Sequence, residues 1–255
     1  DYGLSISGGG EKSSYLSSIN YFNQDGILDG SGFKRLNARF NSTHEFGKFK
    51  LSQSLGLAEG KLQENNWYGF DGTTAPTVAL RNTTNDGGFE APSTGVHGPG
   101  GVNQFALASL EDNLETTRTL FASLKLDYEI TEELSAGINL GVDYTTQKRF
   151  QFTPTYFMSN VDAVRNVNDL NDLTVFNQED VNLLFEPTLS YNKTFNDVHK
   201  VSVVLGHTRF VENQNSSGIY GQGTPANSIR VVGALPSNDQ NILLGQDNKA
   251  GLLSY

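Results

Sequence analysis

The feature that most constrains the fold of this chain is an alternation of apolar and polar residues. From Leu120 to Tyr128 every second residue is apolar, and the residues between them include serine, lysine and aspartate. A β-strand places alternate side chains on opposite faces, so this segment has one apolar and one polar face. After a tight turn at 131–133 the alternation resumes at Leu134 and continues to Tyr144. Strands of this length with a polar second face are typical of a β-barrel that crosses a membrane.

The connections between the strand-like segments are alternately short and long. Short turns are expected near 9–12, 45–48, 131–133 and 196–199, a medium loop near 23–32, and long loops at about 60–112, 153–180 and 213–251. Loops in compact soluble domains hold about four to six residues, whereas membrane barrels have tight hairpins on one side and long loops on the other. We therefore predict an all-β fold, an antiparallel transmembrane β-barrel segment of about eight strands with short periplasmic turns and long extracellular loops.

The composition excludes several classes of protein. No run of eighteen apolar residues occurs, so the sequence predicts no transmembrane helix. A hydrophobic content of 36% is compatible with a barrel, whose strands need only half of their residues to be apolar. With a net charge of −10 and no basic stripe, the chain is not expected to bind nucleic acid. It contains no cysteine, which excludes disulfides, thiolate metal sites and cysteine nucleophiles.

Aromatic residues gather near the ends of the expected strands. Rings with one wet and one apolar side favour the membrane–water boundary, so these residues are candidates for two aromatic girdles. The alternative is the ordinary enrichment of aromatic residues in all β-strands. The residues concerned are Tyr21, Phe22, Phe46, Phe49, Tyr128, Tyr144, Phe150, Phe152, Tyr191, Phe195 and Phe210.

A more specific pattern lies between residues 3 and 42. It consists of LSISGGGEKS at 4–13, YLSSINYFNQDGI at 15–27 and FKRLNARFN at 33–41. With these motifs the chain resembles a barrel segment of the SusC/RagA family, the TonB-linked (TonB-dependent) outer-membrane transporters of Bacteroidetes-type bacteria. The residues that carry the resemblance are Ser7, Gly8, Gly9, Lys12, Tyr15, Ser18, Tyr21, Gly26, Arg35, Arg39 and Asn41.

The resemblance implies a barrel of about 22 strands that is occluded by an N-terminal plug. It implies import of oligosaccharides or peptides through the outer membrane, driven by TonB with ExbB and ExbD. A SusD-like surface lipoprotein would then cover the extracellular mouth, and outer-membrane lipid would surround the barrel. About eight strands cannot close at this diameter, and lipid does not tolerate open sheet edges. We therefore expect residues 1–255 to be part of one barrel domain whose plug and remaining strands lie outside this chain.

Two arginines are candidates for the interior of such a barrel. Arg35 and Arg39 alternate with Leu36, Ala38 and Phe40, so they occupy the opposite face of the strand. In the family the plug fills the lumen, and the resemblance implies that these arginines pair with plug carboxylates. The alternative is that lumen water or carboxylates of neighbouring strands satisfy them.

Two loop segments are candidates for binding. Trp67, Tyr68 and Phe70 form an aromatic cluster that could stack on sugars or peptide side chains, or instead pack the loop against itself or a lid partner. Asn168, Asp169 and Asp172 are weak candidates for a structural Ca²⁺ in an extracellular loop. This segment lacks the glycine and final glutamate of an EF-hand loop, so a hydrated polar loop is favoured and no cofactor is expected.

No catalytic residues are predicted. The chain has no nucleophile elbow, phosphate-binding loop or zinc-binding helix, and its four histidines lie on separate elements. We expect a part of a transporter and not an enzyme. Two other functions stay open, namely a barrel component of a secretion or surface-assembly complex, and a surface glycan-binding or adhesive β-module.

Overall fold

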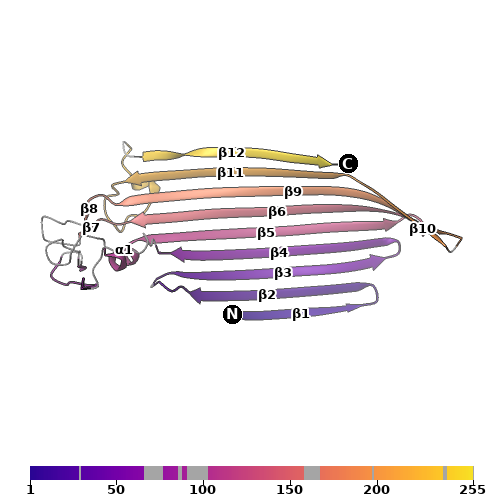
Figure 1. Ribbon diagram of the computed structural model, residues 1–255, viewed down its shortest axis with the longest axis horizontal. Coiled ribbons are helices and arrows are strands. Elements are labelled where there is room, and N and C mark those ends of the chain that lie inside the picture. Colours follow the sequence, from indigo (N-terminus) through magenta and orange to yellow (C-terminus); the bar gives the residue numbers. More distant parts are fainter. Residues whose placement is uncertain are drawn as a thin grey trace.

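One large antiparallel sheet accounts for most of the structure (Figure 1). The computed structural model describes residues 1–28, 30–65, 77–85, 88–90, 103–157, 167–196, 198–237 and 240–254. The ten strands of the sheet are β1 (Tyr2–Gly10), β2 (Ser13–Asp25), β3 (Gly32–Phe46), β4 (Phe49–Glu64), β5 (Asp112–Glu129), β6 (Leu134–Thr153), β9 (Asp172–Phe195), β10 (His199–Gly206), β11 (Thr208–Gln222) and β12 (Gln240–Ser254).

Small elements cluster at one end of the sheet (Figure 1). They are α1 (Gln104–Leu110), the paired short strands β7 (Tyr156–Phe157) and β8 (Val167–Asn168), and the 3₁₀ helix η1 (Val232–Ala234). No helix in the described part of the chain is long and apolar enough to cross a membrane.

The strands pair in chain order, as expected of a meander. The order across the sheet is β1-β2-β3-β4-β5-β6-β9-β11-β12, and β10 also pairs with β9. β10 and β11 keep one register on β9, from His199 opposite Phe195 to Gln222 opposite Asp172. They are interrupted at His207, whose neighbour Pro187 accepts its N–H (3.1 Å) but has no N–H to return. The two strands therefore act as one long strand with a missing ladder bond.

The predicted alternation of short and long connections is confirmed. The hairpins β1–β2, β3–β4, β5–β6 and β9–β10 all turn at the same end of the sheet. Gly47 (φ 62°) and Asn196 (φ 52°) provide the left-handed residues of two of these turns. The described parts of the connections 26–31, 65–111, 154–171 and 223–239 lie at the opposite end, which we call the loop end (Figure 1).

Two predicted loops are shorter than expected. The loop predicted at 213–251 is reduced to 223–239, because β11 continues to Gln222 and β12 begins at Gln240. The loop predicted at 153–180 ends at Asp172, where β9 begins. Near the loop end both faces of these strands carry polar side chains, so the alternation disappears from the sequence while the backbone ladder continues. For the same reason the sheet has ten strands where the alternation indicated about eight.

The sheet has one apolar face, which we call the belt face. Its side chains are exposed although they are large and apolar, as in Ile19 (48%), Leu57 (50%) and Leu183 (45%). Complete burial of such a side chain stabilises by about 1.5–3 kcal/mol, so in water each of these half-exposed side chains would forgo roughly half of that free energy. Cross-strand neighbours on this face include Ile19, Ala38, Leu57, Leu120, Tyr144 and Val181 in one row and Leu55, Ala122, Val142 and Leu183 in the next.

No second layer covers the belt face within the described residues. The buried hydrophobic side chains of this part of the chain number only six, and all of them lie at the loop end or in its connections. They are Phe89, Ala106, Leu107, Phe152, Leu173 and Leu235. A soluble sheet of this size would place its core against the apolar face. The belt face is therefore an uncovered apolar surface in the described part of the chain.

The apolar belt shifts along the strands from one edge of the sheet to the other. Tyr15 ends the belt on β2 and lies in one row with Ser42, Gln53 and Leu124. On β5 the belt continues four residues beyond Leu124, to Tyr128. A belt that is level with a membrane crosses successive strands at shifted positions only if the strands are tilted. Strand tilt of this kind is a requirement of barrel closure.

The aromatic girdle prediction is supported at some positions and wrong at others. At the turn end of the belt face, the ring centroid of Phe49 lies 4.6 Å from that of Tyr128 and 6.0 Å from that of Phe46. Phe152 is fully buried in a loop-end cluster. Phe22 lies on the opposite face of the sheet, where it packs against Phe33.

Candidate functional site

The face opposite the belt, which we call the polar face, carries a hydrogen-bonded network across four strands. Asn139 on β6 donates from Nδ2 to the Glu186 carboxylate on β9 (2.9 Å) and accepts from Ser123 on β5 (3.3 Å). Glu186 also accepts from Thr208 on β11 (3.3 Å). These hydrogen bonds join neighbouring strands and so hold the four side chains in fixed positions. The polar face is therefore an ordered, hydrophilic surface.

A second junction of this network centres on Asp180 of β9. Its two carboxylate oxygens accept from Gln178 Nε2 (2.8 Å) and from Gln214 Nε2 on β11 (2.9 Å). Polar side chains of this kind bind solutes or a second protein surface through hydrogen bonds.

The two arginines singled out from the sequence lie on the polar face of β3. Arg39 stands between Ser18 on β2 and Gly56 on β4, and Arg35 stands in the same strand four residues away. Both side chains are exposed, and neither forms an ion pair with another described residue. The register explains the placement, because the belt side chains Leu36 and Phe40 alternate with the arginines. Two positive charges are thus available to a partner that faces this surface.

The loop end contains a small core that anchors the connection between β4 and β5. Phe89, Ala106 and Leu107 are buried together. Asn103 caps α1 by accepting from the Ala106 N–H (3.0 Å), and its Nδ2 donates to the carbonyls of Leu80 and Glu90. The described parts of this long connection are therefore held against the first turn of the helix.

An arginine completes this first core. The Arg81 guanidinium lies 5.2 Å from the ring centroids of both Phe89 and Phe105. Tyr156 packs against the same cluster, and burial, together with the nearby charges of Glu111 and Asp172, raises the pKa of its hydroxyl. The role of Arg81 could not be predicted from the sequence, because the rings that it contacts are brought together only by the fold.

At the loop end, a second core joins strands β6 and β9 to the connection 223–239. Phe152 and Leu173 are fully buried under Leu235. Leu235 fits over Gly221, where a Cβ atom would lie 2.7 Å from Leu235 Cδ1. Arg230 lies 4.5 Å from the ring centroid of Phe152. It also pairs with Asp112 at 3.1 Å. The loop end is thus a packed structure at the end of the barrel wall.

Of the predicted binding residues, some lie in the described part of the chain and others do not. Trp67, Tyr68 and Phe70 lie outside the described residues. Asn168 donates from its amide to the carbonyl of Pro154 (2.9 Å), and Asp172 accepts from the hydroxyl of Tyr220 (3.0 Å) and from Gln222. Within the described ranges no three histidine, aspartate or glutamate side chains gather in a way that could hold a metal ion.

The chain was compared with known proteins by sequence and by structure. No family model matches the chain. It is 27% identical to TonB-dependent receptor P39 of Formosa agariphila, over 80% of this chain and 19% of the relative. It is 26% identical to TonB-dependent receptor P26 of the same organism, over 89% of this chain and 23% of the relative. The chain thus spans about a fifth of the length of these curated relatives.

Solved structures show the same fold. The chain superimposes on the RagAB peptide transporter with a TM-score of 0.77 and 17% identity, over 98% of this chain and 28% of that chain. The RagAB peptide importer in its open-open state gives a TM-score of 0.77 and 18% identity, with the same shares covered. The chain is therefore similar in sequence to TonB-dependent receptors, and its fold matches part of the barrel of the RagAB structures.

Proposed function

We propose that the protein containing this chain imports oligosaccharides or peptides across the outer membrane in a TonB-driven manner. The observation that carries the proposal is the one-sided apolar belt on long tilted strands, in a chain whose relatives are named TonB-dependent receptors. In this proposal the belt face contacts lipid, the polar face lines the lumen, and the loop end faces the cell exterior. Energy enters through the TonB–ExbB–ExbD system, and no covalent chemistry is involved.

The proposal requires further polypeptide around the described sheet. The outer edges of β1 and β12 have no strand partner among the described residues. Unpaired backbone groups are costly in the hydrocarbon region, each by several kcal/mol, because no water is present to replace the missing bonds. Additional strands of the intact barrel would pair with both edges, and a plug would fill a lumen of this width.

In this proposal Arg35 and Arg39 are contact residues for the plug. Their guanidinium groups have no ion-pair partner among the described residues, and the face that carries them is the polar one. A carboxylate of the plug would form charge-assisted hydrogen bonds with them, which are stronger than bonds between neutral groups. The arginines would then couple plug position to the barrel wall.

The packed loop end is compatible with a barrel opening that a partner protein closes. The two small cores at Phe89 and Phe152 give this end a defined surface against which a SusD-like lipoprotein could close. The cargo class stays open between oligosaccharide and peptide. The solved RagAB structure is that of a peptide transporter, but at 17% identity the likeness supports the fold and not the cargo. Trp67, Tyr68 and Phe70 remain proposed cargo contacts on loop 60–112.

The test is purification of the intact protein from its native outer membrane in detergent, followed by identification of its partners. We expect a plug-bearing barrel that co-purifies with a surface lipoprotein, and uptake of labelled oligosaccharides or peptides that is lost when TonB is deleted. Export that persists without TonB would instead support the secretion component. A protein that stays soluble without detergent would overturn the barrel and support the adhesive module.

A further inference from the structure

The belt face carries a row of lysines where the apolar belt ends, toward the loop end. Lys34 on β3 lies directly opposite Lys61 on β4. In the same row Thr116 separates Lys61 from Lys148 on β6. Like charges in directly opposed positions destabilise a sheet. Three lysines in one row are unexpected in a chain whose net charge is −10.

The neighbouring carboxylates neutralise this row only in part. Glu59 lies on β4 two residues nearer the belt than Lys61. Its carboxylate forms ion pairs with both Lys61 (3.2 Å) and Arg118 (2.6 Å). Glu179 on β9 lies in the same cross-strand row as Glu59 and Arg118. Its carboxylate accepts from the hydroxyl of Tyr144 (3.0 Å) and pairs with none of the lysines. Neither Lys34 nor Lys148 forms an ion pair with another described residue.

The row stands at the depth of lipid headgroups if the belt marks the hydrocarbon core. Lys34 lies two residues beyond Leu36, and Lys61 lies four residues beyond Leu57. At a rise of about 3.3 Å per residue on a tilted strand, the two Cα atoms stand about 5–10 Å above the belt edge. Lysine side chains at this depth extend their ammonium groups toward the headgroup phosphates.

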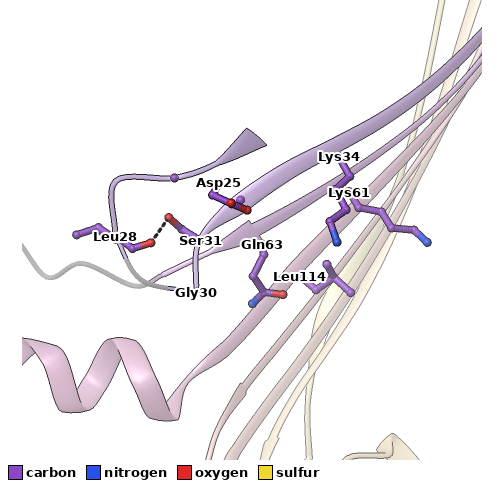
Figure 2. A pocket seen from close by; sticks show the side chains of 10 residues that line it. Asp25, Leu28, Gly30, Ser31, Lys34, Lys61, Gln63 and Leu114 are labelled. Atoms are coloured by element: carbon purple, nitrogen blue, oxygen red, sulfur yellow. Dashed lines mark hydrogen bonds between the residues drawn. The ribbon is translucent and has the colours of Figure 1, made fainter. Parts of the chain in front are cut away.

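A preformed pocket adjoins the two lysines. Its volume is about 540 Å³, and its lining includes Lys34, Lys61, Gln63 and Leu114. Figure 2 shows that these side chains come from neighbouring strands beside the β2–β3 loop. Within that loop the Gly26 N–H donates to the Ser31 carbonyl (2.8 Å). The N–H and the hydroxyl of Ser31 both donate to the Leu28 carbonyl (3.0 and 2.7 Å).

Among the described residues, one opposing charge lines the pocket. The carboxylate of Asp25 lines it, and no ion pair joins Asp25 to either lysine. The lysines thus meet one carboxylate in the pocket and share one more through Glu59. Together with Arg118 and Lys148 the two lysines carry four positive charges against these two carboxylates, so an anion with two negative charges would neutralise the remainder.

We propose that Lys34 and Lys61, flanked by Arg118 and Lys148, bind the phosphate group of an anionic lipid in the outer leaflet. This inference rests on the membrane-embedded barrel proposed above. The site is on the lipid side of the wall and is therefore separate from the lumen and from cargo. The lipid phosphate offsets the repulsion between the opposed lysines and fixes the height of this edge of the barrel in the membrane.

The experiment is native mass spectrometry of the intact transporter in detergent, titrated with bisphosphorylated lipid A. A lysine near an anionic surface contributes about 1 kcal/mol, which is about fivefold in affinity, so Lys34→Gln with Lys61→Gln should weaken binding about 25-fold. Lys12→Gln is the control for net charge, because Lys12 lies in the turn at the opposite end of the sheet. It should leave the affinity unchanged.

Two further titrations identify the source of the phosphate. Dephosphorylated lipid A should bind the unmodified protein and the double variant equally, and inorganic phosphate should not compete at millimolar concentration. Equal affinity of the double variant and the Lys12 variant for bisphosphorylated lipid A would overturn the site. Full competition by inorganic phosphate would overturn the lipid as its occupant.

The same preparation separates failure of the site from failure of the proposed function. A protein that needs no detergent and carries no lipid would contradict the membrane barrel itself. A detergent-dependent barrel that imports cargo, but whose lipid A binding ignores the lysines, would contradict only the site.

Discussion

The most discriminating substitution is a charge at the centre of the apolar belt. Leu124 lies midway along the apolar run of β5, between Gln53 on β4 and Leu140 on β6. A lysine on the lipid face of a barrel near the bilayer midplane costs about 2–4 kcal/mol. The side-chain amide of Gln53 gives the new ammonium group one polar neighbour, so we expect Leu124→Lys to cost about 2–3 kcal/mol.

The adjacent residue provides the matched control. Ser123 points to the polar face, where its hydroxyl donates to Asn139 (3.3 Å) and where Lys125 already pairs with Asp127 (3.1 Å). Ser123→Lys introduces the same charge at the same depth and loses one weak hydrogen bond, at a cost of about 1 kcal/mol or less.

The assay is urea unfolding of the intact protein in phosphatidylcholine vesicles, followed by the gel mobility of the folded and unfolded forms. We expect Leu124→Lys to lower the free energy of unfolding by at least about 1 kcal/mol more than Ser123→Lys does. Equal losses for the two variants, or a larger loss for Ser123→Lys, would refute the assignment of the two faces.

Three further substitutions test other parts of the account. Arg39→Glu should leave folding in vesicles within about 0.5 kcal/mol of the original but reduce cargo uptake at equal surface abundance, whereas full uptake would argue against a plug contact. Pro187→Ala supplies the missing donor to the His207 carbonyl, so amide exchange along β10 should slow, and unchanged exchange would contradict the broken-ladder explanation. Gly221→Val should displace Leu235, because a Cβ atom at this position would lie 2.7 Å from Leu235 Cδ1. Protease cleavage within 223–239 should then increase on intact cells, and an unchanged digestion pattern would count against the loop-end core.

The sequence predicts the middle of each strand well and its loop end poorly. Within the belt a period of two is enforced by lipid on one side and water or protein on the other, so Leu120–Tyr128 and Leu134–Tyr144 could be assigned from the sequence alone. Toward the loop end both faces of β11 are polar, as at the adjacent residues Asn213 and Gln214, and nothing in the local sequence distinguishes strand from loop. The backbone ladder nevertheless continues to Gln222.

Features that depend on register across strands could not be predicted. The face that carries Arg35 and Arg39 follows from one strand and was predicted. The opposition of Lys34 to Lys61 depends on the pairing of β3 with β4, and it becomes visible only in the sheet. Phe152 was assigned to a girdle because it lies near a strand end, but its burial depends on Leu235, more than eighty residues away.

The central claim is that one face of this sheet contacts lipid and the other contacts water or protein. Because the 255 residues contain no cysteine, single cysteines can be introduced one by one from Leu120 to Tyr128 in the intact protein in vesicles. Each cysteine would carry a spin label, and its collision rates with oxygen and with a water-soluble nickel complex would be measured. We predict a period of two, with oxygen favoured at positions 120, 122, 124, 126 and 128 and restricted access to oxygen at the positions between them. Collision rates that favour the nickel complex at every position, or that show no period of two, would contradict the membrane barrel.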